Sequence, residues 1–406
     1  MKNRVLVIGA GVIGASTALA LAEKGFSVSV AEKASGLAQG ASGANGAQLS
    51  YYYTDALASP ETRRALPKLM MGLNSAFRLS PSIDIDFFRW GVQFLRNTTS
   101  SRSDANTLAV LELALQSKVV LNQWCQQYQF DFDHRVAPKL HLYEDQRLLD
   151  AVQRRLELKN QHGANQFMVT AQEAMDIEPS LQHMRANLAG AVHSPDEEVG
   201  DVEAFTLAAL RKAMELGGGR LWLDTEITEF RTTQNRAHSV HTAQGEIEFD
   251  HLVISAGYQS MQLARKLGVK IGLIYPVTGY SLTYPQSAAT PEVSLTDTVN
   301  RFVLCRLGDQ LRLAGMADVG RVVTSPPAKR IQQLRELLHQ RFPLAGDYQS
   351  SERVWAGIRP LTPSGRPLVE KTGMDNVYIN AGHGFLGWTL AAGSANLLAK
   401  LVEEQT

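Results

Sequence analysis

The chain begins with the pattern of a strand, a glycine-rich turn, a helix and a second strand, which constrains the fold more than any other feature. Arg4–Ile8 is largely apolar and rich in β-branched side chains, as in a short buried strand. The letters GAGVIG follow, residues 12–24 have helical periodicity, and residues 26–31 alternate as a second strand that ends at Glu32. This order predicts a βαβ unit of the dinucleotide-binding type.

The three glycines of that turn have separate expected roles. Gly9 permits the tight turn, Gly11 lets the backbone approach a pyrophosphate, and Gly14 lets the helix pack closely on the strand. The helix amino terminus supplies N–H donors and a partial positive charge, and the acidic residue after the second strand can accept hydrogen bonds from both hydroxyls of a ribose. The residues expected to contact the dinucleotide here are Gly9, Gly11, Val12, Ile13, Gly14, Glu32 and Lys33. The unit alone leaves NAD and FAD as alternatives.

Length and composition describe a globular protein with two domains. The chain has 406 residues, of which 44% are apolar and 20% are charged, and its formal net charge is zero. The balanced charge and the lack of a dense basic run argue against nucleic-acid binding. Two cysteines occur without a CxxC pair or a Cys/His cluster, so neither a disulfide framework nor a metal site is expected, and a reducing compartment fits. Cys305 lies in a strand-like stretch, where packing explains it better than a covalent link to a flavin.

Segments after the βαβ unit favour FAD. Residues 40–50 are small, flexible and polar, as in a loop along a pyrophosphate or flavin edge, although an ordinary surface loop has the same composition. Residues 250–258 have the pattern of a buried strand that ends in small residues, and residues 219–227 and 243–249 read as further strands of a nucleotide-binding sheet. The cofactor contacts expected from these segments are Ser42, Asn45, Gly46, Ala47, Gln48, Ile227, Ala256 and Gly257.

A second copy of the glycine pattern, GHGFLG, occurs near the end of the chain. Residues 376–380 before it resemble a strand, and residues 388–402 after it have the apolar face of a helix. Four residues follow position 402, too few for the second strand and acidic residue of a dinucleotide-binding unit. The pattern still provides a helix amino terminus with free N–H groups. We therefore expect one cofactor, held at opposite ends by the two glycine patterns.

Three further stretches, together with the amino-terminal pattern and with Ser42 and Asn45, resemble a known family. They are YPVTGYS at residues 275–281, WAGIRPLTP at 355–363 and GHGFLGWT at 382–389. Their order and spacing resemble the FAD-dependent D-amino-acid oxidase superfamily, and within it the bacterial D-amino-acid dehydrogenases of the small-subunit type. The resemblance implies a two-domain α/β flavoprotein, with a Rossmann-like FAD-binding domain assembled from discontinuous segments and a substrate domain built on a mixed sheet.

The chain departs from the usual pattern of that family at two places. Relatives usually read Asn-Ala-Gly where this chain reads Asn45-Gly46-Ala47, which affects the expected geometry of the cofactor loop. Thr278 stands where many of the dehydrogenases have lysine, so their substrate preference is not carried over to this chain.

The resemblance also implies roles for individual residues of the active site. Arg359 would bind the carboxylate of the substrate, for which a planar guanidinium is suited. Tyr53 and Tyr280 would close the site, although Tyr53 fits a core position in a strand equally well. Gln48 would line the site, unless it is a solvated loop residue. His383 would place a donor beside the flavin pyrimidine ring, or it is a turn histidine satisfied by the backbone.

The same resemblance places the second glycine pattern at the pyrimidine end of the flavin, where the helix amino terminus would stabilise negative charge. The residues expected at this end are Gly357, Arg359, Gly382, His383, Gly384, Phe385, Leu386, Gly387, Trp388 and Thr389.

The implied reaction is oxidative deamination by non-covalently bound FAD, with D-amino acids favoured as substrates. A hydride passes from the α carbon to flavin N5, the imine is hydrolysed to a 2-oxo acid and ammonia, and a quinone-type acceptor takes the electrons. Three alternatives stay open. They are an oxidase that uses oxygen on glycine, sarcosine or a proline derivative, an NAD-dependent dehydrogenase, and a flavin-holding subunit of an electron-transfer assembly.

The expected domains alternate along the chain. The FAD-binding domain is expected to contain residues 1–60, 148–270 and 350–406. The substrate domain is expected to contain residues 61–147 and 271–349, with a helix at 324–341.

Two segments that mix basic and apolar residues, at 66–71 and 86–96, bear on where the protein is located. A helix of this composition lies on a membrane surface or packs against its own domain, and both interpretations fit the sequence. The resembling dehydrogenases are peripheral membrane proteins, so we expect a cytoplasmic protein and leave contact with the inner face of the cytoplasmic membrane open. The uncharged run at residues 5–22 also resembles a signal peptide, but its glycines have the spacing of a strand–turn–helix.

Overall fold

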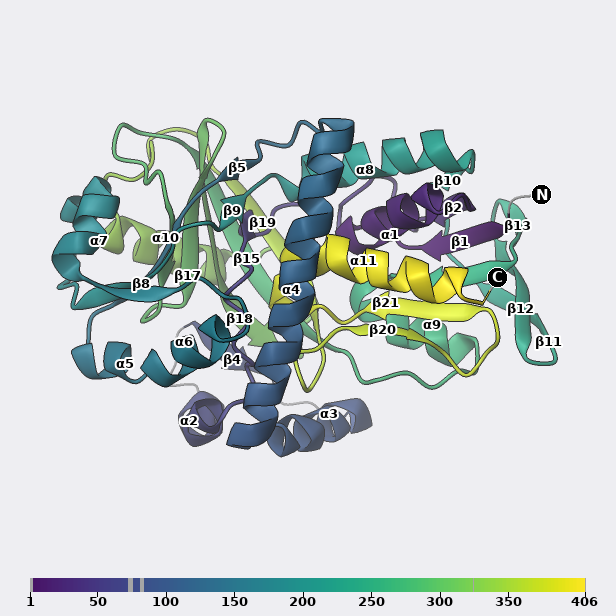
Figure 1. Cartoon of the computed structure of the whole chain (residues 1–406), viewed down its shortest axis with the longest axis horizontal. Coiled ribbons are helices and arrows are strands. Elements are labelled where there is room, and N and C mark those ends of the chain that lie inside the picture. The colour runs from purple at the N-terminus through teal and green to yellow at the C-terminus, as the bar shows by residue number, and fades with distance from the viewer. Residues whose placement is uncertain (1–2, 72–75, 81–83, 324, 406) are drawn as a thin grey trace.

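Two main sheets organise the computed structural model, which describes residues 3–71, 76–80, 84–323 and 325–405. The smaller sheet, six-stranded in these described residues, lies on the right in Figure 1 and takes its strands from the beginning, middle and end of the chain. Its order is β10 (Leu221–Trp222), β2 (Ser27–Ala31), β1 (Arg4–Ile8), β14 (His251–Ile254), β21 (Val377–Ala381) and β20 (Leu368–Lys371). All of its pairs are parallel except that of β20 with β21. This arrangement confirms the predicted Rossmann-like sheet assembled from separated segments.

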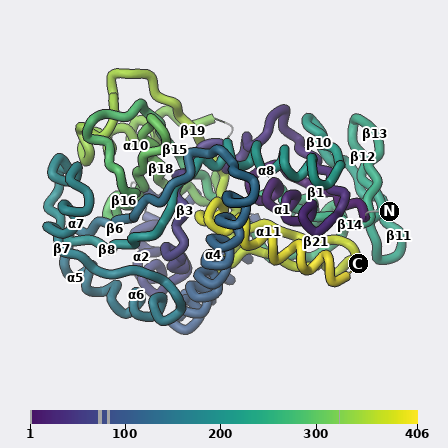
Figure 2. The backbone as a smooth tube through the Cα atoms, turned by 45° about the horizontal axis from the view of Figure 1, so that its top comes forward, coloured from purple at the N-terminus to yellow at the C-terminus, as the bar shows by residue number. Residues whose placement is uncertain are grey.

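Small residues explain how closely the helices pack on this sheet. β1 and β2 are joined by α1 (Val12–Glu23), an alanine-rich helix that is buried along nearly its whole length. The helices α8 (Val202–Gly217) and α11 (Gly387–Glu403) pack against α1, and α4 (Ser100–Tyr128) packs against α11. A β-carbon at Gly393 of α11 would lie 2.7 Å from the backbone of α4, so the glycine permits this close approach. Figure 2 shows α4 running between the two main sheets.

The larger sheet, nine-stranded over the described ranges, is mixed and lies on the left in Figure 1. The order is β19 (Arg353–Leu361), β15 (Tyr275–Pro285), β18 (Gln310–Val319), β17 (Phe302–Leu307), β16 (Ser294–Asp297), β6 (Lys139–Tyr143), β8 (Gly190–Ser194) and β7 (Phe167–Thr170), and β4 (Phe77–Leu79) pairs with β18. The pairs β6–β16 and β4–β18 are parallel and the others are antiparallel. The helix α10 (Ala328–Arg341) packs on β15 and β18 through its apolar face.

Two small antiparallel sheets lie beside the main ones. One contains β11 (Glu229–Thr233), β12 (Arg236–Thr242) and β13 (Gly245–Glu248), and the other contains β3 (Gln48–Leu49), β9 (Glu198–Val199) and β5 (Arg135–Val136). The prediction that residues 243–249 form a strand of the nucleotide-binding sheet is wrong, because β13 instead pairs with β12 as an antiparallel hairpin. The strand predicted within 219–227 is β10, which does pair with β2 in that sheet.

The sheets divide the chain differently from the predicted domain segments between residues 61 and 270. The segment 148–270 was expected in the FAD-binding domain, yet its strands β7 and β8 hydrogen-bond within the larger sheet. Conversely, α4 belongs to the segment 61–147 expected in the substrate domain, but its apolar face shares a hydrophobic core with α1 and α11. Strand pairing and the burial of an apolar helix face decide these memberships.

The other α-helices of the described residues are between 5 and 12 residues long. Their bounds are α2 (Pro60–Met70), α3 (Ile85–Arg96), α5 (Gln146–Asp150), α6 (Gln153–Asn160), α7 (Ala171–Ile177) and α9 (Ser260–Lys266). The helix predicted at 324–341 corresponds to α10, which begins at Ala328, and Thr324 lies outside the described residues.

One helical stretch in the described part of the chain, Gly384–Glu403, is long and apolar enough to cross a membrane. Within the structure, 61% of its apolar window is buried. Because this stretch contains α11, which packs between α1 and α4, its place in the hydrophobic core explains its composition.

Candidate active site

A large cavity lies between the two main sheets. Its volume is about 1300 Å³, above the roughly 300–1,000 Å³ that is typical of small-molecule sites. Residues after β1 and β2 line one end, and residues of β15, β18, β16 and β6 line the other. The cavity is therefore large enough for a dinucleotide cofactor together with a small substrate.

The structure brings the sequence-predicted site residues together around this cavity, with three exceptions. Gly14, Ala47 and Thr389 do not line it. Gly14 packs behind the turn, Ala47 is buried, and the hydroxyl of Thr389 accepts a hydrogen bond of 2.9 Å from the backbone N–H of Ser50. These three residues hold neighbouring segments in place.

Close backbone contacts explain the glycines of the first turn. Gly9 has a φ of +107°, and a β-carbon there would lie 2.6 Å from the carbonyl oxygen of Ser255. A β-carbon at Gly14 would lie 1.9 Å from the carbonyl oxygen of Gly9. Neither position can hold a side chain, so a ligand can approach the backbone of the turn closely where α1 begins at the cavity. The first backbone N–H of α1, on Val12, donates to the hydroxyl of Ser42 at 3.0 Å.

Glu32 lies at the end of β2 and lines the cavity. Its carboxylate accepts hydrogen bonds from the backbone N–H groups of Ala10 at 2.8 Å and of Ala34 at 2.9 Å. Each carboxylate oxygen keeps a further lone pair, so the group is fixed in place and can still accept ribose hydroxyls.

The loop after β2 is shaped by three residues in a row. The side-chain oxygen of Asn45 accepts from the backbone N–H of Ala47 at 2.8 Å, and its carbonyl accepts from the buried Arg312 at 3.1 Å. A β-carbon at Gly46 would lie 2.8 Å from a methyl group of Val303. Ala47 has a φ of +57°, in the left-handed region that favours glycine. The order Gly-Ala therefore places glycine where space is short and alanine where the backbone is strained.

The second glycine pattern forms a turn between β21 and α11. Gly382 and Gly384 both have positive φ values, of +83° and +55°. Gly384–Leu386 forms a single 3₁₀ turn, and α11 follows without a side-chain cap. Both helix amino termini, of α1 and of α11, therefore reach the same cavity from different strands of one sheet.

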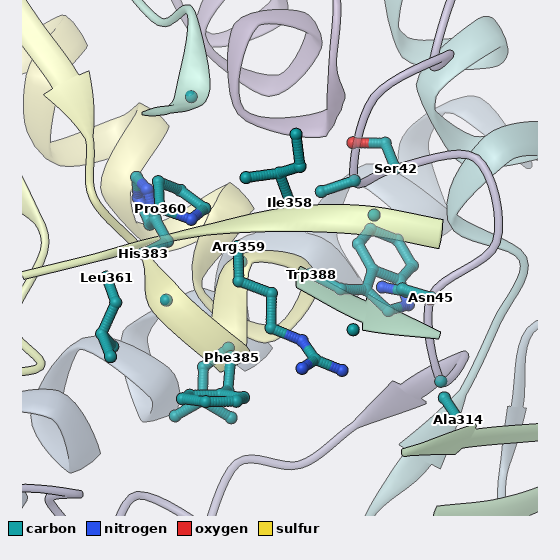
Figure 3. A pocket seen from close by; sticks show the side chains of 18 of the residues that line it. Ser42, Asn45, Ala314, Ile358, Arg359, Pro360, Leu361, His383, Phe385 and Trp388 are labelled. Atoms are coloured by element: carbon teal, nitrogen blue, oxygen red, sulfur yellow. The ribbon is translucent and has the colours of Figure 1, made fainter. Parts of the chain in front are cut away.

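Arg359 extends from β19 into the cavity beside Phe385 (Figure 3). It donates a hydrogen bond of 2.9 Å to the carbonyl of Met316, and its guanidinium lies 4.9 Å from the centre of the Phe385 ring. Gly279 leaves room for it, since a β-carbon there would lie 2.2 Å from the guanidinium. Burial lowers the pKa of Arg359 to about 10, and the electrostatic interaction with Tyr280 raises this pKa by a smaller amount. Arg359 is therefore charged at neutral pH, and it forms no ion pair with any carboxylate that the structure describes.

Tyr280 forms a fixed wall next to Arg359. Its ring is buried, and its hydroxyl donates to Asp318 at 2.7 Å. Asp318 also pairs with the buried Arg330 at 2.5 Å. Burial and the neighbouring carboxylate raise the pKa of Tyr280, so the phenol stays protonated and its proton stays on this bond.

His383 is buried beneath the second glycine turn. Its Nε2 lies 3.0 Å from the hydroxyl of Ser394, while Nδ1 has no hydrogen-bond partner within the described residues. The ring is thus held by a side chain of α11, not by the backbone as one sequence-based alternative proposed. Burial lowers the pKa of His383 to about 3, so the ring is neutral. It can contribute a hydrogen bond to the cavity but no positive charge.

Tyr53 and Gln48 line the cavity from the loop that follows the cofactor turn. Tyr53 is 41% exposed, in contrast to the buried Tyr51 and Tyr52, and its ring meets His141 edge-on at 4.5 Å. Gln48 donates to the carbonyls of Leu295 and Leu304 at 3.3 and 3.4 Å, so it is held by the larger sheet and is not a solvated loop residue.

Several cavity residues were not identified from the sequence. They include Thr54, Lys139, His141, Gln166 and Thr296. A signal was available for two of them, because the alternation of the strand KLHLY places Lys139 and His141 on one face. A buried strand with a lysine and a histidine on one face indicates that this face meets a polar partner.

Comparison with known proteins identifies the family. Residues 4–401 match the family described as DAO, FAD dependent oxidoreductase. The chain belongs to the DAO family. A D-amino acid dehydrogenase of Paramagnetospirillum magneticum is 36% identical, over 98% of this chain and 94% of that protein.

Solved structures of the DAO fold match over nearly the whole chain. Glycine oxidase from Geobacillus kaustophilus has a TM-score of 0.76 at 20% identity, and the match covers 99% of this chain and 95% of that one. L-alpha-glycerophosphate oxidase from Mycoplasma pneumoniae, solved with FAD bound, has a TM-score of 0.76 at 14% identity, with coverage of 99% and 95%. The protein is therefore an FAD-dependent oxidoreductase with the fold of this family.

As a DAO-family member the protein binds FAD, and the cavity residues fit this cofactor. The turn at Gly9 and Gly14 brings bare backbone and the start of α1 to one end, as a pyrophosphate requires. Glu32 at the same end supplies a fixed acceptor for a ribose. The uncapped start of α11 lies at the cavity as well, where its partial positive charge favours an electron-rich ring.

Proposed function

We propose that the protein oxidatively deaminates D-amino acids to 2-oxo acids and ammonia and passes the electrons to a quinone-type acceptor. The observation that carries this proposal is Arg359, a partly buried cation that points into the cavity and has no carboxylate partner in the described chain. A charged group in such a place costs free energy until an anion binds it, and a guanidinium binds a carboxylate through two parallel hydrogen bonds. The relatives named D-amino acid dehydrogenase support the choice of amino acids as substrates.

The residues around Arg359 would orient the substrate. Arg359 would bind the α-carboxylate, the wall formed by Tyr280 would limit its movement, and Tyr53, whose ring contacts His141, would cover the site. When bound, FAD accepts the hydride that leaves the substrate α carbon. The start of α11 would stabilise negative charge at the adjacent edge of the site. No side-chain nucleophile is required.

Anaerobic mixing of the purified holoenzyme with a panel of amino acids, each in D and L form, tests the proposal. We expect D-amino acids to bleach the flavin absorption and their L forms to react much more slowly. Bleaching by the L forms alone would overturn the stereochemical assignment, and no bleaching by any amino acid would overturn the proposed function.

The electron acceptor separates a dehydrogenase from an oxidase. We expect rapid turnover with a soluble quinone analogue and slow formation of peroxide in air-saturated buffer. Fast peroxide production, with glycine, sarcosine or a proline derivative as the substrate, would instead favour the oxygen-using alternative. Glycine oxidases occur among proteins of the same fold, so this control is necessary.

We also propose that the protein is cytoplasmic and that α3 contacts the inner face of the cytoplasmic membrane. Its inner face, with Trp90 and Phe94, packs on the protein, while Ile85, Phe88, Val92 and Leu95 form an exposed apolar stripe. These positions share one helix face by their spacing, and basic residues lie beside them, as in helices that rest on anionic membranes. In Figure 1, α2 and α3 lie at the same end of the molecule.

Co-sedimentation with vesicles that contain anionic phospholipid tests this contact. The double variant Phe88→Ser with Leu95→Ser should lose vesicle binding. The matched control, Val119→Ser with Leu207→Ser, removes exposed apolar side chains from α4 and α8 and should retain it. Equal binding by both variants would exclude α3 as the contact surface.

A further inference from the structure

The end of the cavity on β6 contains a buried lysine, in addition to the Arg359 guanidinium at the other end of the substrate space. Lys139 is only 1% exposed, and its ammonium donates to the hydroxyl of Ser50 at 2.6 Å. The ammonium lies 4.9 Å from the centre of the Tyr53 ring, and His141 follows on the same face of β6. Lys139 forms no ion pair within the described residues. Two of its three N–H donors are thus available to a ligand.

Buried polar atoms without hydrogen-bond partners in the described chain line the cavity, and two of them lie on β6 and its neighbour β16. They include His141 Nε2, Thr296 Oγ1, Thr54 Oγ1 and Gln166 Oε1, while others belong to Ser255, Asn380 and His383. Thr296 stands directly beside His141 in the pairing of β16 with β6. Native proteins rarely leave buried polar groups unpaired, so the neighbouring His141 and Thr296 indicate a place for a polar ligand group.

The charges nearby identify the sign of that group. Lys159, the other lysine at this end, is neutralised by Asp55 at 3.0 Å and also donates to the backbone carbonyl of Tyr52. Glu197 attracts Lys139 but does not line the cavity, and its carboxylate accepts the backbone N–H of Tyr52. Lys139 is therefore the lysine at this end that lines the cavity without an ion-pair partner in the described residues.

The distance between the two cations sets the length of a ligand that could join them. The guanidinium of Arg359 is bonded to β18, and β6 lies three strands further along the sheet. With strands about 4.8 Å apart, the strand axes are separated by roughly 14 Å. Both side chains line the same cavity over this sheet. A small molecule with an anionic group at each end can then contact both.

We propose that Lys139 determines substrate specificity by binding the side-chain carboxylate of an acidic amino acid while Arg359 binds its α-carboxylate. Thr296 donates a further hydrogen bond to the side-chain carboxylate. This assignment rests on the proposed amino-acid oxidation and adds the substrate class, a dicarboxylic amino acid of the size of aspartate or glutamate.

Two measurements on the holoenzyme test the assignment. The first is anaerobic flavin reduction by glutamate, glutamine and norleucine, all with the same configuration at the α carbon. Their side chains have similar lengths. We expect glutamate to reach half-saturation at a concentration at least about tenfold lower than glutamine, as expected for a charge-assisted hydrogen bond. The second is calorimetric binding of glutarate, which carries both carboxylates and cannot be deaminated.

Variants of Lys139 and Thr296 test whether these residues cause the preference for glutamate. Lys139→Met should remove the preference for glutamate over glutamine and weaken glutarate binding by about tenfold or more. Thr296→Val should reduce the same preference by a smaller factor, and it serves as the second variant if Lys139→Met does not fold. The surface change Lys329→Met on α10 is the matched control and should leave both measurements unchanged.

The outcomes distinguish this inference from the proposed function. Equal half-saturation for glutamate and glutamine in the wild type, or an unchanged ratio in Lys139→Met, would overturn the role of Lys139 while neutral amino acids still reduced the flavin. Failure of every amino acid to reduce the flavin would instead overturn the proposed function. Loss of the glutamate preference and of glutarate binding together in Lys139→Met would support the assignment.

Discussion

At the scale of the residue, the cofactor loop shows how a reversed pair of small residues affects stability. Ala47 occupies a left-handed backbone conformation, while the neighbouring Gly46 lies against Val303. A left-handed alanine costs about 1–2 kcal/mol relative to a right-handed one, and glycine does not carry this cost.

We therefore predict that Ala47→Gly stabilises the protein by up to about 1 kcal/mol, after the greater chain entropy of glycine is subtracted. Gly46→Ala should destabilise it, because the new β-carbon would meet a Val303 methyl group at 2.8 Å. Thermal unfolding of the two variants beside the wild type measures both effects. A lower melting temperature for Ala47→Gly would contradict this account of the loop.

A second residue, His383, predicts a specific pH dependence of stability. Burial lowers the pKa of His383 to about 3 in the folded protein, whereas an unfolded chain takes up this proton near pH 6.5. Between these values the unfolded state binds more protons, so stability is fully present above about pH 6.5 and is lost as the pH falls, by up to about 1.4 kcal/mol per pH unit.

The variant His383→Gln removes this contribution and should show a shallower loss of stability between pH 6.5 and 4.5. Urea unfolding of both proteins at several pH values in this range gives the comparison. Since all other titrating groups are shared, parallel curves for the two proteins would show that His383 is not buried as a neutral ring.

At the scale of the element, the two glycine patterns differ in what their third glycine does. A β-carbon at Gly14 would lie 1.9 Å from a backbone carbonyl oxygen, but one at Gly387 would meet its nearest neighbour, the β-carbon of His383, at 3.7 Å. The first pattern joins two parallel strands of a sheet, whereas the second begins a core helix.

We predict that Gly14→Ala purifies with little or no FAD, because the turn between β1 and α1 must open to admit the side chain. Gly387→Ala is the matched change in the other pattern and should retain its flavin. The ratio of flavin to protein absorbance measures both. Equal flavin loss from the two variants would contradict the different roles assigned to the patterns.

Local patterns also explain which elements could be predicted from the sequence. The amino-terminal βαβ unit is contiguous, so its apolar strands, glycines and Glu32 were sufficient to predict it. The strands β7, β8 and β13 were assigned to the wrong part of the fold or left out. β7 and β8 join the larger sheet through β6, which pairs with β16, a strand more than 150 residues later in the chain. β13 pairs with its neighbour β12 instead of with the nucleotide-binding sheet.

The site residues also divide into those that a local motif predicts and those that only the strand order brings together. Arg359 and the glycines were predicted because they belong to motifs that resemble a family. Lys139 and Thr296 belong to no motif, and they become neighbours in one cavity only through the order of strands in the larger sheet. Their polar character in buried strands was the remaining signal, and it did not show which cavity they would face.

At the scale of the whole molecule, function depends on two sheets that enclose one cavity. The six-stranded sheet brings the starts of α1 and α11 to the cavity, and the larger sheet brings Arg359 and Tyr280 to it. Cofactor and substrate sites thus come from segments far apart in the chain, which meet because both sheets are completed by the carboxy-terminal part.

The central claim is that Arg359 binds the α-carboxylate of an amino acid that reduces the flavin. Anaerobic stopped-flow reduction by the best amino-acid substrate, compared between wild type and Arg359→Gln at equal flavin content, tests it most directly. Loss of the ionic partner of the substrate carboxylate predicts a half-saturating concentration at least about 100-fold higher in the variant, and no reduction of the wild-type flavin by the corresponding amine that lacks the carboxylate. An unchanged half-saturating concentration in Arg359→Gln, or equal reduction by that amine, would contradict the claim.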